Sequence, residues 1–291
     1  MTEFSSLPVT VVIPTVGRPE KLRGALDSIA ACRPRAREVV VVDQSGAAAV
    51  FELVARFDHV GARVVRCRGR GVSRGRNLGI RDASHDLVLI TDDDCTVAEG
   101  WVATAAAAMR RVPGGIVTGR VLPVGNPLGV PSTKDDPRPF DFTGLPHGGA
   151  LFPNNMALDR DAVLGFGGFD ERFGPEEAAE DNEFCYRWLN AGRSIHYVPE
   201  LIVWHHDWRT PKQLEELYIA YARGQGFFYA KHLYERDLRM IRWIVRDVYW
   251  ALRGLAAAGV RRRPRWTDPR RGIPAGLPVG LWRGFRAYRA P

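Results

Sequence analysis

The chain has 291 residues, 45% of them hydrophobic, and a net charge of +8, so it can bury one large core or two modest ones. Its four cysteines lie far apart without C-x-x-C spacing, which argues against a zinc cluster or a disulfide framework and favours a reducing compartment. The start MTEFSSLPVTVV carries an acid where a signal peptide carries a base, and no run of about 18 uncharged apolar residues follows, so we expect a cytoplasmic protein without a membrane span.

Apolar runs rich in β-branched residues alternate with helical patterns along the first hundred residues. We expect strands over residues 9–15, 38–45, 62–67 and 87–91, helices over 19–31 and 48–57, and a turn leading into a helix within 71–83. This alternation is typical of βαβ units and a mostly parallel sheet. The sequence therefore predicts an α/β fold with a Rossmann-like sheet flanked by helices.

Polar side chains follow these strands at their carboxyl ends, where open α/β sheets bind ligands. Thr15, Asp43 and the run Asp92, Asp93 and Asp94 occupy these positions. Three neighbouring carboxylates repel one another unless a cation lies between them, and oxygen ligands suit Mg²⁺ or Mn²⁺. In an extended segment Asp92 and Asp94 point one way, and Asp93 points toward the interior or a ribose. The alternative is an acidic turn that caps a helix beginning near residue 97.

A further helix is predicted over residues 180–192, where apolar and aromatic residues fall at helical spacing and Gly192 can end the helix. Its first turn holds Glu180 and Asp181. These acids are either a catalytic pair or residues that complement the helix dipole.

The apolar run LIVWHHD, residues 201–207, is strand-like and reaches His205 and His206. Strand alternation lets only one of the two histidines point inward. We favour His205 as a metal-ligand candidate because it directly follows the apolar run. A lone histidine in such a place is otherwise a surface residue or a satisfied core residue.

Residues 212–256 are predicted as two helices. The second places Arg239, Arg242, Arg246 and Arg253 on one face and Ile241, Ile244, Val245 and Val248 on another. Residues 261–291 contain nine arginines and a single acid, Asp268, and are interrupted by proline and glycine residues. We expect this stretch to be an irregular basic tail. This region either rests on an anionic membrane surface or packs on the rest of the protein with a solvated basic face.

Five segments, taken in order, resemble the nucleotide-sugar glycosyltransferases of family 2, which have the GT-A fold. They are VTVVIPTVGRPEKLRGALDSI, VVVVDQS, GVSRGRNLGI, ITDDDC and GGFDERFGPEEAAEDNEFCYRWLNAG, and the resemblance covers about residues 9–210. It implies a GT-A catalytic domain over 1–210, with a nucleotide-sugar half (1–100) and an acceptor half (101–210). A helical extension with the basic, Arg-rich tail would follow over 211–291.

The resemblance also implies roles for the nucleotide-site candidates. Asp43 would accept hydrogen bonds from a nucleobase imide, which favours a UDP or dTDP sugar, although an ordinary Asx turn is the alternative. Arg74 and Arg76 would neutralise phosphate charge, and Asn77 would orient the nucleotide or its loop. The other nucleotide-site candidates are Thr15, Asp92 and Asp93.

For the reaction, the resemblance implies a single in-line displacement with inversion at the anomeric carbon. Asp94 with Asp92 and His205 would hold Mn²⁺ or Mg²⁺, which stabilises the charge on the departing diphosphate. Asp181 would remove the proton from the acceptor hydroxyl, supported by Glu180.

The acceptor stays open: a saccharide, a lipid-linked intermediate or a small molecule. Asn154, Asn155, His147 and Gly149, in the irregular stretch 120–158, are candidates to line its pocket, with residues 165–177 as the other wall. The chain lacks the Q-x-x-R-W motif and spanning segments of processive members, so we expect transfer of one sugar. A peripheral position at the inner face of a membrane is compatible with the basic helix.

Two other classes compete with this interpretation. A sugar-nucleotide pyrophosphorylase would share the sheet, but IPTVGRPEKLRG has a single glycine where that class carries a G-x-G-x-R-x-x-P-L-like loop. A nucleic-acid-binding module is suggested by the tail alone and leaves both acidic clusters unexplained. We therefore expect no nucleic-acid partner.

Overall fold

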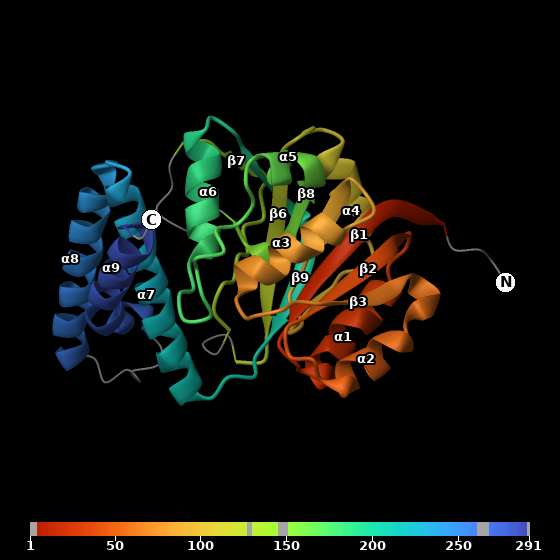
Figure 1. The fold of residues 1–291 in the computed structure, drawn as a ribbon, viewed down its shortest axis with the longest axis horizontal. Coiled ribbons are helices and arrows are strands. Elements are labelled where there is room, and N and C mark those ends of the chain that lie inside the picture. Colours follow the sequence, from red (N-terminus) through yellow and green to blue (C-terminus); the bar gives the residue numbers. More distant parts are fainter. Residues whose placement is uncertain (1–4, 127–129, 145–150, 261–267, 290–291) are drawn as a thin grey trace.

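The computed structural model describes residues 5–126, 130–144, 151–260 and 268–289, and only the backbone of residues 255–260. Its centre is a nine-stranded sheet in the order β3-β2-β1-β4-β8-β6-β9-β5, with β7 paired to β9 (Figure 1). The strands are β1 (Ser6–Thr15), β2 (Arg35–Asp43), β3 (Ala62–Arg66), β4 (Leu87–Ile90), β5 (Cys95–Val97), β6 (Ile116–Val124), β7 (Phe140–Phe142), β8 (Met156–Asp159) and β9 (Ile195–His206).

The first four strands are parallel to one another, as predicted, and the α/β architecture is confirmed. β1 is apolar on both faces because it lies between β2 and β4 with helices above and below, and its residues from Val9 to Thr15 are all buried. The second half of the sheet is mixed: β8 runs antiparallel to β4 and β6, whereas β6 and β9 are parallel.

Helices cover both faces of the sheet. α1 (Pro19–Ala30), α2 (Ala48–Ala55) and α4 (Trp101–Met109) pack on one face, in a core that includes Leu22, Val50 and Trp101. α3 (Val72–Asp82), α5 (Arg160–Gly165) and α6 (Glu180–Asn190) pack on the other, in a core that includes Ile80, Val163 and Trp188. Short 3-10 turns occur at Asp58–Val60, Pro153–Asn155 and Pro269–Gly272.

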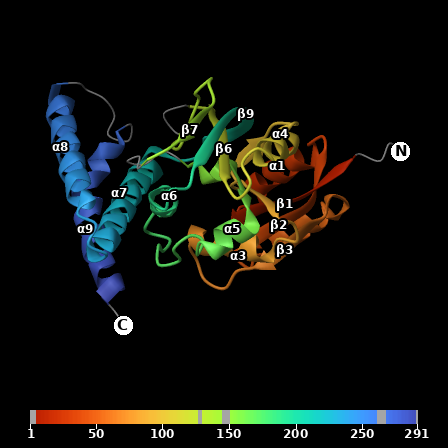
Figure 2. The same cartoon turned by 90° about the horizontal axis from the view of Figure 1, so that it is seen from above.

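Three long helices, α7 (Pro211–Tyr234), α8 (Arg239–Val260) and α9 (Ile273–Arg289), stand beyond α6 at one end of the molecule (Figures 1 and 2). α7 begins with a capping box: Gln213 N–H donates to Thr210 Oγ1 at 3.3 Å, the Gln213 side chain accepts from Thr210 N–H at 2.9 Å, and Pro211 follows the cap. Of the helices described, none has the length and apolar character needed to cross a bilayer.

The structure corrects three sequence-based expectations. The stretch over 269–289 is not irregular: it forms a 3-10 turn and the helix α9. The segment after the aspartate run continues as strand β5, because it pairs with β9, and the next helix begins only at Trp101. The stretch over 120–158 contains β7 and the central strand β8, which was missed because it is only four residues long.

Candidate active site

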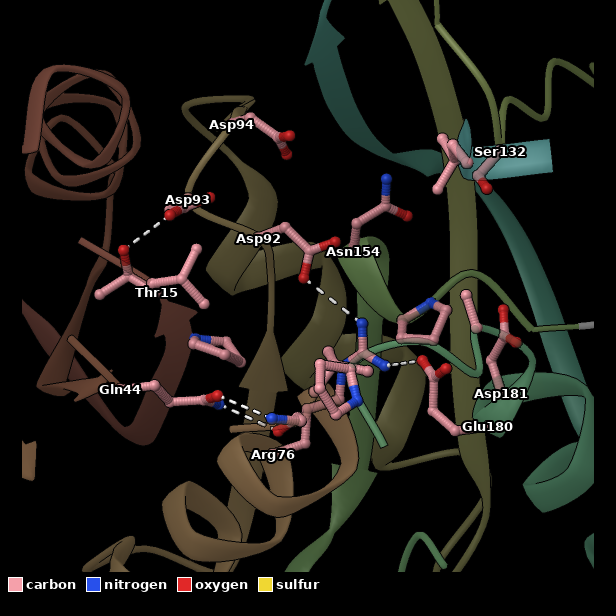
Figure 3. Close-up of a pocket in the computed structure, with 18 of the residues that line it drawn as sticks. Thr15, Gln44, Arg76, Asp92, Asp93, Asp94, Ser132, Asn154, Glu180 and Asp181 are labelled. Carbon is pink, nitrogen blue, oxygen red and sulfur yellow. Dashed lines mark hydrogen bonds and ion pairs between the residues drawn. The ribbon is translucent and has the colours of Figure 1, made fainter. Parts of the chain in front are cut away.

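A cavity of about 480 Å³ opens at the carboxyl ends of β1, β2 and β4 and is closed by α6, β9 and α7. It brings together all the residues predicted for catalysis, nucleotide binding and metal binding except Asp43, Arg74 and Asn77. The predicted residues that line it are Thr15, Arg76, Asp92, Asp93, Asp94, Glu180, Asp181 and His205. Two acidic clusters that lie nearly ninety residues apart in the sequence therefore share one cleft (Figure 3).

The three aspartates after β4 are held apart by different partners. Asp93 is fully buried, accepts a hydrogen bond from Thr15 Oγ1 at 2.6 Å and is ion-paired with Arg18. Burial raises the pKa of Asp93 to about 6, against the opposing effects of Arg18 and Thr15. Asp92 is half-buried in the cavity, so it is available to a ligand. Asp93 thus anchors the turn, while Asp92 and Asp94 face other groups.

Asp94 lies beside the histidine favoured from the sequence. His205 Nε2 is 3.5 Å from Asp94 Oδ1, and both side chains are buried, because His205 pairs with Cys95 across β9 and β5. His206 points the other way and contacts Thr96 Oγ1 at 2.9 Å. Burial opposes ionisation of Asp94, but the neighbouring His205, the charge of Arg209 and the hydrogen bond that Trp208 Nε1 donates to Asp94 Oδ2 at 2.7 Å outweigh burial and hold the pKa below its usual range.

The residues present fit a divalent cation. Ligand atoms of Asp94, Cys95 and His205 all lie within 4.8 Å of one another, and Asp92 lines the same cavity. The buried Nδ1 of His205 has no hydrogen-bond partner in the described part of the chain, so the ring keeps a nitrogen free to act as a ligand. Burial raises the pKa of the Cys95 thiol well above its ordinary value, which leaves Asp94, Asp92 and His205 as the better donors to a hard cation.

Arg76 joins the two acidic clusters. Its guanidinium is buried and donates to Glu180 Oε1 at 2.6 Å, and it lies 3.4 Å from Asp92 Oδ1 (Figure 3). α3 can deliver this side chain because Gly79 lets the helix lie close to the sheet: a Cβ at Gly79 would overlap the side chain of Val12. The buried cation fixes Glu180 and leaves Asp92 half-exposed to the cavity.

Asp181 is the carboxylate of the second cluster that stays available. Its Oδ1 accepts the backbone N–H of Asn182 at 2.8 Å, and the side chain lines the cavity. Burial and the neighbouring charge of Glu180 raise the pKa of Asp181 to about 7, despite the nearby Arg76. A carboxylate with such a pKa is suited to accept a proton near neutral pH.

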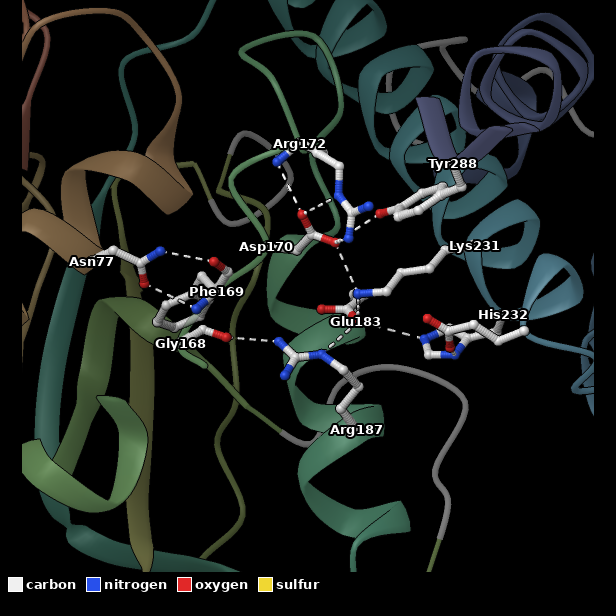
Figure 4. Close-up of polar contacts among 11 residues, drawn as sticks. Asn77, Gly168, Phe169, Asp170, Arg172, Glu183, Arg187, Lys231, His232 and Tyr288 are labelled. Carbon is white, nitrogen blue, oxygen red and sulfur yellow. Dashed lines mark hydrogen bonds and ion pairs between the residues drawn. The ribbon is translucent and has the colours of Figure 1, made fainter. Parts of the chain in front are cut away.

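The other three predicted residues lie outside the cavity lining. The Asp43 carboxylate accepts from the N–H and hydroxyl of Ser45 and from the N–H of Gly46, which is the geometry of an Asx turn. Arg74 is exposed and lies 3.4 Å from Glu171. Asn77 donates to the Phe169 carbonyl and accepts from the Phe169 N–H, so its amide fixes the loop that precedes α6 (Figure 4).

Several lining residues were missed from the sequence. Arg18 and Arg209 bring positive charge to the cavity, Gln44 brackets Gly71 through two hydrogen bonds, and Tyr221 comes from α7. Arg18 and Arg209 each follow a strand within a few residues, so the sequence could have indicated that they lie near the cavity. Tyr221 carried none, because its position depends on how α7 packs.

Of the two asparagines expected to line the acceptor pocket, one lines the cavity and the other does not. Asn154 lines the cavity, whereas Asn155 is fully buried, accepts from Trp101 Nε1 at 2.9 Å and donates to the carbonyl groups of Arg120 and Leu201. His147 and Gly149 lie outside the described residues. From the expected second wall, Gly174, Pro175 and Glu177 reach the cavity.

The helix that carries Asp181 is tied to the C-terminal helices by buried charges. Lys231 Nζ of α7 is 2.6 Å from Glu183 and 2.8 Å from Asp170, and Tyr288 of α9 donates to Asp170 at 2.7 Å (Figure 4). Burial opposes ionisation of Glu183, but His232, Arg187 and Lys231 hold its pKa at about 2. Glu183 is therefore a charged, fully buried member of this cluster.

Residues 7–226 match the family described as Glycosyltransferase like family 2. The chain belongs to this family. The match begins in β1 and ends in α7, so it contains both acidic clusters and the α7 residues of the cavity wall. Membership makes the chain a glycosyltransferase-like protein and does not favour the pyrophosphorylase or nucleic-acid-binding alternatives.

Among curated proteins, this family 2 chain is similar to the pre-mycofactocin glycosyltransferase of Mycobacterium tuberculosis, with 28% identity over 216 residues. The alignment covers 69% of this chain and 43% of that protein, so the chain spans less than half the length of the curated relative.

Among solved structures, the family 2 chain is similar to PcManGT, a mannosyltransferase from Pyrobaculum calidifontis in complex with GDP-Man and Mn²⁺. The TM-score is 0.64 at 18% identity, with 96% of this chain and 90% of that chain covered. S. aureus TarS 1–349 in complex with UDP gives a TM-score of 0.58 at 21% identity, with 75% and 65% covered. These likenesses show the fold, and the predicted GT-A architecture is confirmed.

Proposed function

We propose that this protein transfers one sugar from a nucleoside-diphosphate sugar to an acceptor hydroxyl with inversion at the anomeric carbon. One observation carries the proposal: the aspartates after β4 and the Glu180–Asp181 pair line the same cavity and are joined by Arg76. A donor bound at the first cluster therefore has its anomeric carbon directed toward the second.

Positive charge in the cavity supports a diphosphate donor. Arg18, Arg76 and Arg209 line it, and guanidinium groups bind phosphate oxygens through paired hydrogen bonds. TarS is in complex with UDP and PcManGT with GDP-Man, so the neighbours' ligands do not decide which nucleobase the donor of this protein carries. We favour a UDP or dTDP sugar on the family resemblance of the segment around Asp43, and the next residue, Gln44, lines the cavity.

Asp94, His205 and Asp92 would hold Mn²⁺ or Mg²⁺. When bound, the ion supplies Lewis-acid stabilisation of the diphosphate charge. Arg18 and Arg209 lie within 4.0 Å of Asp94 and add positive charge on the same side. Mn²⁺ accompanies GDP-Man in PcManGT, which supports this choice of cation.

Asp181 is the proposed general base. Its raised pKa and its place in the cavity suit removal of the proton from an acceptor hydroxyl as that oxygen attacks the sugar. Glu180 is held by Arg76 and positions the pair. Attack from the face opposite the diphosphate inverts the anomeric centre in one step.

The acceptor side of the cavity is apolar and aromatic where α7 forms the wall, through Leu217 and Tyr221. A saccharide, a lipid-linked sugar or a small aglycone is compatible with this wall. We expect transfer to stop after one sugar, so a product ladder formed from a single binding event would contradict the proposal.

Thermal shift with a panel of nucleoside diphosphates, each with and without Mn²⁺, tests the donor and the metal together, because a ligand of the folded state raises Tm with its affinity. In Asp94→Ala we expect the metal-dependent part of the shift to vanish. In Asp181→Asn we expect the shift to persist while product formation falls by at least about a hundredfold, the range for a lost general base.

Asp161→Ala is the matched control, because the Asp161 side chain is 76% exposed on α5. It should leave both readouts unchanged. An unaltered metal-dependent shift in Asp94→Ala would overturn the metal site, and full transfer by Asp181→Asn would overturn the assignment of the base.

A further inference from the structure

α8 presents three distinct faces. One packs on α7 and α9 through Met240, Trp243 and Ile244, and Asp247 accepts a hydrogen bond from Tyr229 at 2.6 Å. The other two faces are exposed to solvent, although the sequence pattern predicts a helix with a single apolar side. The sequence had grouped Ile241, Val245 and Val248 with Ile244 on one apolar side, yet these three side chains point outward.

The first exposed face is an apolar stripe of Ile241, Val245, Val248, Tyr249 and Leu252, which Leu238 extends by one residue before the helix begins. Leu238, Val245 and Leu252 are more than 60% exposed, and Ile241 is 50% exposed. Leu238, Ile241, Val245, Val248 and Leu252 recur at intervals of three and four, with Tyr249 beside Val248, so the stripe is one continuous row along the helix. Soluble proteins rarely leave such a row uncovered unless it is an interaction surface.

The second exposed face is an arginine row of Arg239, Arg242, Arg246 and Arg253. Ile241, Val245 and Leu252 are each followed directly by an arginine of this row, so the two rows run side by side, about 100° apart around the helix. Asp247 accepts a hydrogen bond from Tyr229 on the packed side of the helix, and Arg239 is ion-paired with Asp237 at the start of the row. Residues 211–291 contain 17 Lys and Arg and six Asp and Glu, hence +11, while residues 1–210 contain 24 and 27, hence −3.

We propose that the apolar stripe and the arginine row of α8 dock the protein on an anionic lipid bilayer. A helix lying in the plane of the interface buries its apolar row among the acyl chains while adjacent arginines contact lipid phosphates. A second copy of the chain fits this surface less well, because an antiparallel two-fold contact of the apolar stripes would place both arginine rows on the same side.

The placement of α8 leaves room for a bilayer. α8 lies at the opposite end of the molecule from β3 in both views, and from α2 in Figure 1 (Figures 1 and 2). α7, which packs between α8 and the catalytic unit, also forms the cavity wall through Leu217 and Tyr221. If the proposed function holds, docking would present the cavity to a lipid-linked acceptor, but the docking itself requires no donor or metal.

Flotation of the full-length protein with vesicles tests the docking directly. We expect it to float with phosphatidylcholine vesicles that contain phosphatidylglycerol, to stay at the bottom with phosphatidylcholine alone, and to be released by high salt. The variant Ile241→Gln/Val245→Gln/Leu252→Gln should lose flotation. Arg242→Gln/Arg246→Gln should weaken the partition coefficient roughly thirtyfold, about fivefold for each arginine.

Arg110→Gln/Arg111→Gln is the matched control, because it removes two exposed arginines near the end of α4 and should float like the wild type. An unchanged Tm shows that each variant is folded. Absence of flotation of the wild type on anionic vesicles would overturn the proposal. So would a concentration-dependent dimer in sedimentation that the apolar-stripe variant abolishes, since a second copy would then be the occupant.

Discussion

Arg76 is the residue on which the geometry of the cavity depends most. A buried cation between two acids is costly to remove, because the acids are then left in a poorly solvated place with no counter-charge. Glu180 is itself buried and has Arg76 as its ion-pair partner. Arg76 therefore holds the second cluster at a fixed position relative to the first.

Arg76→Met should lower the free energy of unfolding by about 3–5 kcal/mol, because it leaves Glu180 buried and uncompensated. Arg74→Met is the control: that side chain is 44% exposed on the same helix and should change stability by less than about 0.5 kcal/mol. Urea denaturation of both variants measures the difference. Equal effects would show that Arg76 is solvated in solution and does not join the clusters.

The raised pKa of Asp181 predicts a pH dependence. A general base works when ionised, so kcat/KM should rise with pH up to about 7 and level off above it. The charge of Glu180 contributes to this raised pKa, so Glu180→Gln should move the rising limb to lower pH. Measuring kcat/KM against pH for both proteins checks the sign. A limb that stays in place or moves upward would exclude Asp181 as the titrating group.

At the scale of single residues, the sequence located the site residues whose position follows from a nearby strand. His205 was favoured because it directly follows the apolar run, and the structure turns it toward Asp94, whereas His206 contacts Thr96. Asp92 and Asp94, which follow β4, line the cavity. Arg74 and Asn77 were assigned to the nucleotide site through the family resemblance of the segment GVSRGRNLGI, which also contains Arg76. A helix turns neighbouring residues to different faces, so Asn77 reaches the loop before α6 instead.

Among the elements, α9 shows where composition misled the prediction. Gly272, Gly276, Gly280 and Gly284 recur every four residues, so they fall on one side of a helix instead of interrupting it. A Cβ at the first three positions would collide with backbone carbonyls of α7, and at Gly284 with the Cβ of Ala230. The glycines allow the two helices to touch along their backbones. This reason for the glycines depends on α7, so the sequence of the tail alone does not reveal it.

Gly280→Ala should destabilise the protein by about 1–3 kcal/mol, the usual cost of overpacking, because the new methyl group meets the carbonyl of Arg223. Gly165→Ala is the matched control, since nothing lies within 4 Å of a Cβ at that position at the end of α5. It should be neutral or slightly stabilising. The two Tm values decide the comparison, and a Gly280→Ala protein as stable as Gly165→Ala would mean that α7 and α9 are less closely packed.

At the scale of the whole molecule, the catalytic unit and the helices that follow residue 210 share one hydrophobic core. One hydrophobic cluster combines Phe173, Ala179 and Tyr186 of the catalytic unit with Phe227 of α7 and Leu277 of α9. The family match also continues past that point, to residue 226. Periodicity located the helices. Their packing on α6 depends on contacts between segments about fifty to a hundred residues apart, and a local sequence pattern does not predict such contacts.

Lys231 makes this docking testable. It is buried between Glu183 and Asp170, so Lys231→Met should cost at least about 3 kcal/mol in urea denaturation, whereas Lys212→Met, on the same helix and 86% exposed, should cost less than about 0.5 kcal/mol. Adding Glu183→Gln to Lys231→Met should recover part of the loss, because the unpaired charge is then gone. Since Glu183 lies two residues after Asp181 on α6, transfer by Lys231→Met should slow while the metal-dependent thermal shift with the nucleotide persists. A Lys231→Met protein with wild-type stability would show that the C-terminal helices do not hold the catalytic helix in place.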